Sequence, residues 1–391
     1  MPHAVNYFSK FSSMPQIKNT ASHLTFTSKV NQGSFYTPPK YVNLVMSWLV
    51  KHCVGEKVTI MDPSCGYGAF FALSKEFQKN RFIGNDIDKI AVQTAASNFP
   101  FIERYNLNIL QNVSRKAYSI SPDETLCIVG NPPYNDTTSQ IRNELKTDKI
   151  SMDSDIQTRD LGISSLLAYN KLEADFVAVL HPLSYLIKGA NFSAGANFFK
   201  NYTMIEHIIF NSQEFENTSK MTGFPIIVAL YKRTPFFGME YQDVLRTDFK
   251  TVEGDSFKPI NRDYLSDFVE KYPNKNRYSQ EILFYTLRDI NALKRSRTFI
   301  KERVSNAVDV NPAKLAYYCY IDTFKQFADV PYYLGNMDIP FIHSTFYEIK
   351  DDVMAISKYN HKDIFSDSKL PSENSMQKVR NYINRVVSYK G

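Results

Sequence analysis

The chain of 391 residues is longer than most single domains, so we expect two domains. Its 43% hydrophobic and 22% charged residues are ordinary for a globular protein. Its net charge of +6 permits a polyanionic partner without requiring one. No apolar run reaches the roughly 18 residues of a membrane helix. The four cysteines have no CxxC spacing, which argues against a disulfide framework and a zinc site. The first residues contain no apolar core of a signal peptide, which argues against secretion. Together these features predict a cytoplasmic protein.

Short apolar runs alternate with helical patterns after a polar N-terminal arm of about 30 residues. The first pattern predicts an amphipathic helix over 40–52, directly after Pro38 and Pro39. Another helix runs to about Phe77, and a third begins near Asp88. Strands are predicted over 58–61, 81–85, 126–129, 175–180, 204–210 and 224–231. This alternation is typical of an α/β fold in which helices cover both faces of a parallel sheet.

Two stretches interrupt this alternation. Residues 135–165 are polar and show little apolar periodicity, which indicates a functional loop or disorder. The alternation ends near 234–238, so we place the two domains at 31–236 and 237–391, after the arm over 1–30.

The second domain contains two predicted helices and a basic cluster. The first helix presents one apolar face, made of Leu283, Leu287, Ile290 and Leu293. The last helix does the same with Met376, Val379, Ile383 and Val386. Basic residues follow the first helix: Lys294, Arg295, Arg297, Lys301 and Arg303. Such a cluster suits phosphate binding, although a solvated helix end has the same composition.

A glycine turn, DPSCGYGAF from Asp62 to Phe70, follows the first predicted strand. Gly66 and Gly68 let the backbone turn sharply and approach a ligand, and the next helix offers N–H groups at its N-terminus. Asp86 ends the following strand, where a carboxylate can bind the two hydroxyls of a ribose. Together these features predict a nucleoside site at the carboxyl ends of the sheet, although structural turns contain similar glycines.

The segment Asn131-Pro132-Pro133-Tyr134 follows the strand at 126–129. The prolines stiffen the backbone, and the Pro132 carbonyl and the Asn131 amide oxygen are two acceptors that can converge on a planar NH2 group. Such a pair exposes the nitrogen lone pair for attack, and Tyr134 offers a flat surface on which a base can stack. A plain turn is the alternative interpretation.

These two segments resemble the cofactor motif and the catalytic motif of DNA methyltransferases that modify exocyclic amino groups. A third segment, GSFYTPP over 33–39, resembles the motif that the gamma group of these enzymes places first. In that group the three motifs and a C-terminal target-recognition domain follow in the order found here. The resemblance implies a Rossmann-like methyltransferase sheet, S-adenosylmethionine as the cofactor, and N6 of an adenine extruded from double-stranded DNA as the methyl acceptor.

The resemblance also implies roles for single residues at the cofactor. Thr37 would help to hold the methionine carboxylate, and Asp62 would lie near the ammonium group. Asp86 would bind the ribose, and Asn108 takes the place of an Asp that accepts a hydrogen bond from the cofactor's adenine.

At the target base, the family has a second aromatic residue opposite Tyr134. Phe215 is the first candidate and Phe224 the second, and a core position is the alternative for Phe215. Phe35 is a further candidate for contact with the base. His181 precedes a proline at a strand end, which favours a structural role over that of a base.

In the tail, Lys294, Arg295 and Arg297 are expected to contact DNA phosphates, and no metal is expected. A cognate restriction endonuclease is a possible partner. The alternatives are methylation of N4 of cytosine, a methyltransferase of the same motif that acts on RNA or on protein glutamine, and a binding module that has kept the fold without activity. Ser before the prolines is more usual for cytosine enzymes, so Asn131 favours adenine.

Overall fold

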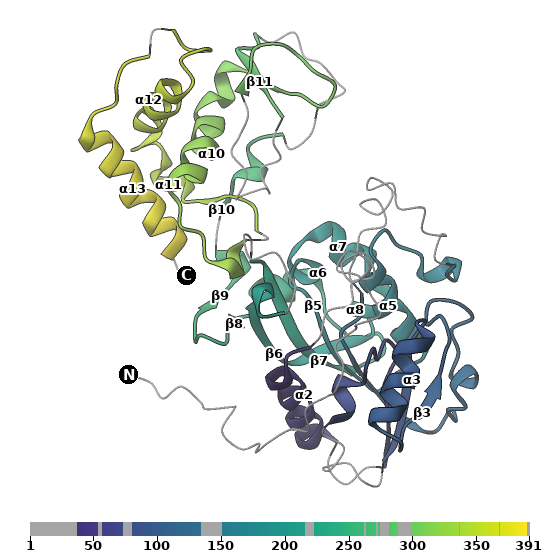
Figure 1. Cartoon of the computed structure of the whole chain (residues 1–391). Coiled ribbons are helices and arrows are strands. Elements are labelled where there is room, and N and C mark those ends of the chain that lie inside the picture. The colour runs from purple at the N-terminus through teal and green to yellow at the C-terminus, as the bar shows by residue number, and fades with distance from the viewer. Residues whose placement is uncertain are drawn as a thin grey trace. The chain divides into compact units, whose positions relative to one another are not determined.

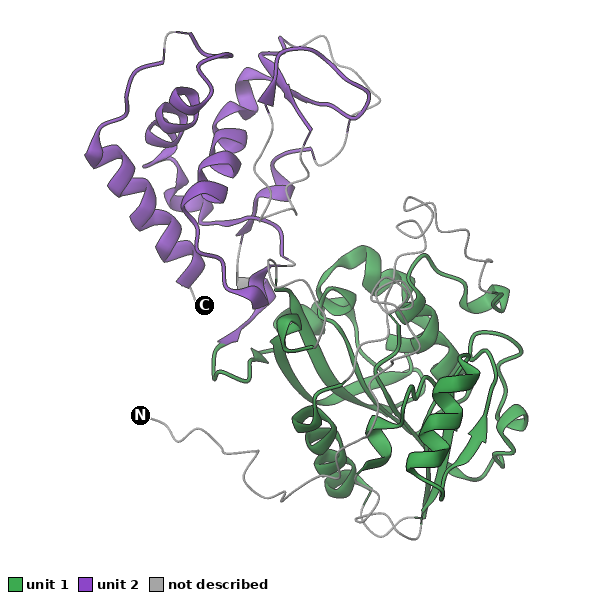
Figure 2. Ribbon diagram, viewed as in Figure 1, with its two compact units in different colours: residues 1–255 green, residues 256–391 purple. Residues whose placement is uncertain are grey.

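The computed structural model describes residues 37–53, 57–72, 80–133, 151–215, 223–261, 263–270, 273, 281–287, 299–335, 337–366 and 368–388. Two compact units divide the chain, one over 1–255 and the other over 256–391 (Figure 2). None of the helices in these described ranges is long and apolar enough to cross a membrane.

The first unit is built on a seven-stranded sheet (Figure 1). Its strands are β1 (Val58–Asp62), β2 (Arg81–Asn85), β3 (Glu103–Tyr105), β4 (Thr125–Gly130), β5 (Phe176–Pro182), β6 (Tyr202–Asn211) and β7 (Pro225–Arg233). They lie in the order β3-β2-β1-β4-β5-β7-β6, and only β7 runs antiparallel to its neighbours. This mostly parallel, Rossmann-like sheet confirms the predicted α/β fold.

Helices cover both faces of this sheet. Those of the first unit are α2 (Pro39–His52), α3 (Lys89–Asn98), α5 (Leu161–Lys171), α6 (Ser184–Ile187), α7 (Gly189–Ala194), α8 (Ala196–Phe199) and α9 (Tyr241–Arg246). On one face, alternate residues of the strands, such as Val58 and Ile60, share a core with apolar residues of α2 and α3. On the other face, Phe198 of α8 packs edge-on against Tyr231 of β7, with ring centroids 5.2 Å apart.

Most sequence-predicted elements of this unit are confirmed. The helix over 40–52 and all six predicted strands are present within one or two residues of their predicted ends. The interpretation of 135–165 as a loop is wrong at its end, because 161–165 form the first turns of α5. The Asp160 side chain caps this helix by accepting the N–H groups of Gly162 and Ile163. Nearly every residue of α5 is buried, and an amphipathic pattern is therefore missing.

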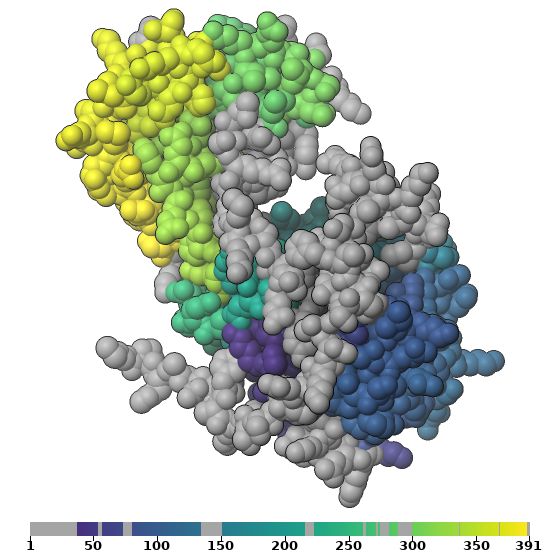
Figure 3. Space-filling view, viewed as in Figure 1, coloured from purple at the N-terminus to yellow at the C-terminus, as the bar shows by residue number. Residues whose placement is uncertain are grey.

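The second unit is mixed α and β. Its helices are α10 (Leu315–Phe327), α11 (His343–Phe346), α12 (Lys350–Asn360) and α13 (Glu373–Ser388). Its strands are β9 (Ser256–Phe257), β10 (Asp263–Tyr264), β11 (Phe284–Thr286), β12 (Phe299–Ile300), β13 (Val308–Val310) and β14 (Pro340–Phe341), whereas β8 (Phe249–Lys250) lies in the first unit. The predicted last helix is confirmed as α13, which buries Val379, Ile383 and Val386 in the core of the unit. In the space-filling view, residues of α12 and α13 (yellow) form a continuous part of its surface (Figure 3).

The prediction of a helix through Leu283 and Leu287 is wrong for the residues that the structure describes. Residues 284–286 form β11, the central strand of a three-stranded antiparallel sheet. Phe284 and Thr286 point into the core, whereas Leu283 and Leu287 are exposed. Strand pairing therefore decides the structure here and overrides the helical spacing of leucines. Residues 288–298, with Lys294, Arg295 and Arg297, lie outside the described residues.

The boundary between the units differs from the predicted one at 236/237. The chain continues to pack on the first unit up to residue 255. Tyr241 of α9 donates a hydrogen bond to the Ile187 carbonyl (2.9 Å), and the Val252 N–H donates to the Ile209 carbonyl (2.9 Å). These contacts join residues far apart in the sequence, and a change in composition does not reveal them.

Candidate active site at the carboxyl edge of the sheet

The predicted cofactor and catalytic motifs lie at one edge of the sheet. In the parallel register Asp62 of β1 stands beside Gly84 of β2, and Met61 stands beside Ile128 of β4. The carboxyl ends of these three strands therefore lie together, where ligands bind in open α/β sheets.

The glycine turn requires its glycines for two different reasons. Gly66 has φ +51° and Gly68 φ +89°, conformations that side chains rarely adopt. A Cβ at Gly68 would lie 2.9 Å from the Phe99 ring, so this glycine permits close packing. A Cβ at Gly66 would meet nothing within 4 Å, so only the positive φ favours glycine there, and the space next to it is open.

Asp62 is a buried carboxyl group at the start of this turn. Burial raises its pKa well above the usual value and the nearby Asp86 raises it further, while a hydrogen bond from the Ser64 N–H (3.1 Å) acts in the opposite direction. A cationic group placed here would relieve the cost of ionising Asp62. The site thus fits the ammonium group that the resemblance assigns to it.

Asp86 follows β2 and organises the backbone around it. Its carboxylate accepts hydrogen bonds from the N–H groups of Gly66 (2.8 Å) and Asp88 (2.9 Å). Burial nevertheless raises its pKa above the usual value. Ile87, directly after it, is 64% exposed and offers an apolar surface at the same edge. The ribose contact of Asp86 stays a prediction.

Asn85 is a residue of this edge that the sequence analysis missed. It is fully buried, and its amide nitrogen donates to the carbonyls of Pro63 (2.9 Å) and Leu107 (3.1 Å). Its oxygen accepts the Leu107 N–H at 3.0 Å. Asn85 therefore fastens the glycine turn to the loop after β3. A polar residue at the end of an apolar strand was the signal in the sequence.

Asn108 lies in that same loop after β3. Its amide nitrogen donates to the Ser151 carbonyl (2.6 Å), and its oxygen accepts the Leu110 N–H (3.0 Å). Both ends of the side chain thus shape the local backbone in this structure. Its contact with the cofactor's adenine stays a prediction.

The catalytic motif begins next to Asp62. A Cβ at Gly130 would lie 3.0 Å from Asp62 Oδ1, so only a glycine lets the end of β4 pass this carboxyl group so closely. Asn131 follows half-buried and Pro132 follows buried. Tyr134 lies outside the described residues.

The remaining candidates divide between the core and the undescribed part of the chain. Thr37 is buried just before α2, and Phe35 lies outside the described residues. Phe215 is 3% exposed and packs edge-on against Phe210, with ring centroids 5.4 Å apart, in the core position that was its alternative. Phe224 is partly buried against the same core. Stacking of either ring on a base stays a prediction.

His181 is held inside the protein by its neighbours. Its Nε2 lies 2.7 Å from the Tyr231 hydroxyl and its Nδ1 lies 2.9 Å from the Pro182 carbonyl oxygen. Burial lowers its pKa to about 4, so the ring is neutral at pH 7. These contacts agree with the structural role predicted for this histidine.

Residues 20–196 match the N-6 DNA methylase family. Solved structures similar to the chain include a protein described as an RNA methyltransferase from Pyrococcus horikoshii, with 11% identity, a TM-score of 0.36, and coverage of 57% of this chain and 93% of that one. They also include the N-methyltransferase NodS from Bradyrhizobium japonicum in complex with S-adenosylhomocysteine, with 12% identity, a TM-score of 0.33, and coverage of 53% and 97%. No curated protein matches the chain. The family match and the order of the sheet together support a methyltransferase that uses S-adenosylmethionine as its cofactor.

Proposed function

We propose that this protein transfers the methyl group of S-adenosylmethionine to N6 of an adenine in double-stranded DNA. The observation that carries the proposal is the contact between the two motifs at the carboxyl edge, where Gly130 passes so close to Asp62 that a Cβ would lie 3.0 Å from its oxygen. The residue expected to bind the cofactor and the residue expected to bind the target amine, Asn131, are thereby neighbours. Methyl transfer needs this proximity of donor and acceptor.

The cofactor would lie along the turn from Asp62 to Gly68. Its ammonium group would pair with Asp62, which is costly to ionise without such a partner. Asp86 would bind the ribose hydroxyls, and the exposed Ile87 would pack on the adenine ring. Thr37 and Asn108 would complete the contacts at the two ends. The bound cofactor supplies an electrophilic methyl group.

Asn131 and Pro132 would act on the target amine. Their oxygens would accept its two hydrogens and draw the nitrogen from planar toward tetrahedral geometry, which frees the lone pair for attack on the methyl carbon. Because neither group could reach N6 inside a base stack, the adenine would swing out of the duplex and stack on Tyr134. The second unit would read the sequence around the target base, with Lys294, Arg295 and Arg297 on phosphates.

A radiolabelled cofactor tests the proposed reaction. The intact protein should transfer label to double-stranded DNA, and hydrolysis should yield N6-methyladenine. Label in N4-methylcytosine would show that the target base is cytosine and not adenine. Label only in RNA or protein would refute DNA as the substrate. Sequencing of modified bases in DNA from cells that express the protein would reveal the recognition sequence. A gene for a restriction endonuclease that cuts that sequence would identify the predicted partner.

The variant Asn131→Ala tests the catalytic assignment. It should bind S-adenosylhomocysteine as the unaltered protein does, but transfer methyl groups at least about a hundredfold more slowly, because an acceptor used in the transition state is lost. Asn191→Ala is a matched control, since Asn191 is half-buried, makes a hydrogen bond to the Ser184 carbonyl (3.2 Å) and belongs to neither motif. Near-normal turnover of Asn131→Ala would contradict the assignment.

A further inference from the structure

Two neighbouring phenylalanines stand in solvent at the edge of the sheet opposite the candidate active site. Phe236 is 75% exposed and Phe237 is 85% exposed. They follow β7, whose Lys232 pairs with Phe176, the first residue of β5. The turn therefore lies at the amino edge of the parallel strands, whereas the cofactor and catalytic motifs lie at the carboxyl edge.

The turn that carries these rings is fixed to the first unit. The N–H groups of Thr234 and Phe236 donate to the backbone carbonyl (2.7 Å) and the side-chain oxygen (3.2 Å) of Asn201. The N–H of Gly238 donates to the Lys200 carbonyl (3.0 Å).

Phe236 itself adopts φ +66°, a conformation that costs a bulky residue about 1–2 kcal/mol. Glycine or asparagine would hold this turn at a lower cost. An exposed phenylalanine in such a position suggests a use outside the fold of the single chain.

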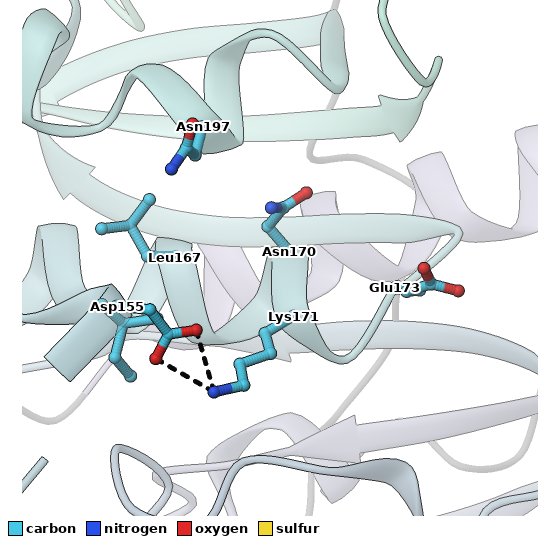
Figure 4. Close-up of a pocket in the computed structure, with 7 residues that line it drawn as sticks. Asp155, Leu167, Asn170, Lys171, Glu173 and Asn197 are labelled. Atoms are coloured by element: carbon cyan, nitrogen blue, oxygen red, sulfur yellow. Dashed lines mark hydrogen bonds and ion pairs between the residues drawn. The ribbon is translucent and has the colours of Figure 1, made fainter. Parts of the chain in front are cut away.

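A pocket in the same unit is linked to the turn through Asn201. Its volume is about 350 Å³, and its lining residues come from the segment before α5, from α5 and its end, and from α8: Asp155, Ile156, Leu167, Asn170, Lys171, Glu173 and Asn197. Figure 4 shows Asn197 facing Leu167 and Asn170 across the pocket. Asn201 joins the two features, because the same amide that bonds the turn donates to Asn170 Oδ1 (3.1 Å) and to the Asn197 carbonyl (3.0 Å).

A protrusion and a hollow on one patch can form a two-fold symmetric contact. Each copy can offer its rings to the hollow of the other, since in such a dimer the same patch serves both partners. We propose that this patch binds a second copy of the chain, with Phe236 and Phe237 of each copy seated at the pocket between α5 and α8 of the other.

The charges around the patch argue against a polyanion, and the area of the rings favours a second copy. Charges of both signs are paired around the patch, with Lys171 2.9 Å from Asp155 and Arg233 3.1 Å from Glu173, so the patch does not suit a polyanion. Four rings that each bury about 150–250 Å² supply on the order of half of a standard interface of about 1,600 Å². Such an interface leaves the carboxyl edge of both copies open.

Sedimentation of the full chain over a range of concentrations tests the proposal. The unaltered protein should be in equilibrium between monomer and dimer. The double variant Phe236→Asn, Phe237→Ser keeps a residue that tolerates the positive φ, and should raise the dissociation constant of the dimer by about a hundredfold or more. Asn197→Trp should have a similar effect, because it fills the pocket and leaves the phenylalanines intact.

Mixing these two variants tests the reciprocal geometry. One retains the hollow and the other retains the rings, so together they should form a one-to-one heterodimer with one intact contact, although each alone is monomeric. Phe237→Cys mixed with Asn197→Cys should form a disulfide-linked pair, and the native cysteines, all of which are buried, should not interfere. Far-ultraviolet circular dichroism checks that every variant is folded, because Asn197→Trp adds a second tryptophan to Trp48.

Three results would overturn the proposal. The unaltered chain could stay monomeric at its highest soluble concentration. The double variant could dimerise as well as the unaltered chain. The cysteine variants could also fail to cross-link while dimers are present, in which case another surface forms the dimer.

Discussion

Replacing Asn85 by Ala should loosen the cofactor site and destabilise the first unit. The side chain makes three buried hydrogen bonds, two to Leu107 and one to the Pro63 carbonyl, with lengths of 2.9–3.1 Å. At about 0.5–1.5 kcal/mol for each, their loss should lower the free energy of unfolding by about 3 kcal/mol. The Kd of S-adenosylmethionine should rise at least about tenfold, because the turn and the loop after β3 lose their link and binding must then order them.

Two measurements check this prediction. Guanidinium unfolding followed by the fluorescence of Trp48, which is buried in α2, reports the stability of the first unit. Titration calorimetry with S-adenosylmethionine reports the cofactor Kd. Arg115→Ala is the control, since Arg115 ties backbone carbonyls of Leu172 (2.8 Å) and Glu124 (2.7 Å) at the opposite edge of the sheet. It should lower stability and leave the cofactor Kd unchanged. An Asn85→Ala protein that loses stability but binds the cofactor normally would refute the positioning role.

Three further predictions concern other groups. Asp62→Asn should stabilise the cofactor-free first unit near neutral pH, because burial raises the pKa of Asp62. The stability of the unaltered unit therefore falls by up to about 1.4 kcal/mol per pH unit as pH rises from the usual carboxyl pKa to the raised one, and the variant should lack this fall. Unfolding followed by Trp48 fluorescence measures this, and an unchanged pH profile would contradict it. His361 lies 3.1 Å from Asp322, which raises its pKa, so protection of α12 from hydrogen exchange should be full below pH 6 and decline as pH rises through the raised value. His361→Gln should remove that dependence, and a slope that persists would exclude His361 as its source. Gly130→Ala should slow methyl transfer and lower the free energy of unfolding by about 1–2 kcal/mol, because its Cβ would lie too close to the Asp62 carboxyl group. Full activity would show that the backbone can shift to accept the Cβ.

The first unit could be read from the sequence because its strands are short, apolar and separated by turns. Three strand ends carried functional candidates, so Asp62 and Asp86 could be assigned to the carboxyl edge, and Asn131 to the end of a third strand, before any contact was known. The last helix was equally clear, because Val379, Ile383 and Val386 repeat at helical spacing and are buried together. Local periodicity was sufficient to predict a helix or strand wherever one face of that element is buried and the other is exposed.

Only the tertiary structure decided the features that depend on contacts between distant segments. Leu283 and Leu287 repeat as in a helix, but pairing with β12 and β13 makes this segment a strand that buries Phe284 and Thr286 instead. Helix α5 is buried on nearly all sides, so it carries no amphipathic signal.

The same reason explains Asn85, Phe215 and the exposed Phe236. An asparagine that links two loops, a phenylalanine in the core and a phenylalanine in solvent look alike in a sequence, because what distinguishes them is the set of neighbours that the folded chain brings to each. The sequence determined the order of the motifs and the chemistry that their side chains can perform. The packing of the sheet determined which of those side chains meet.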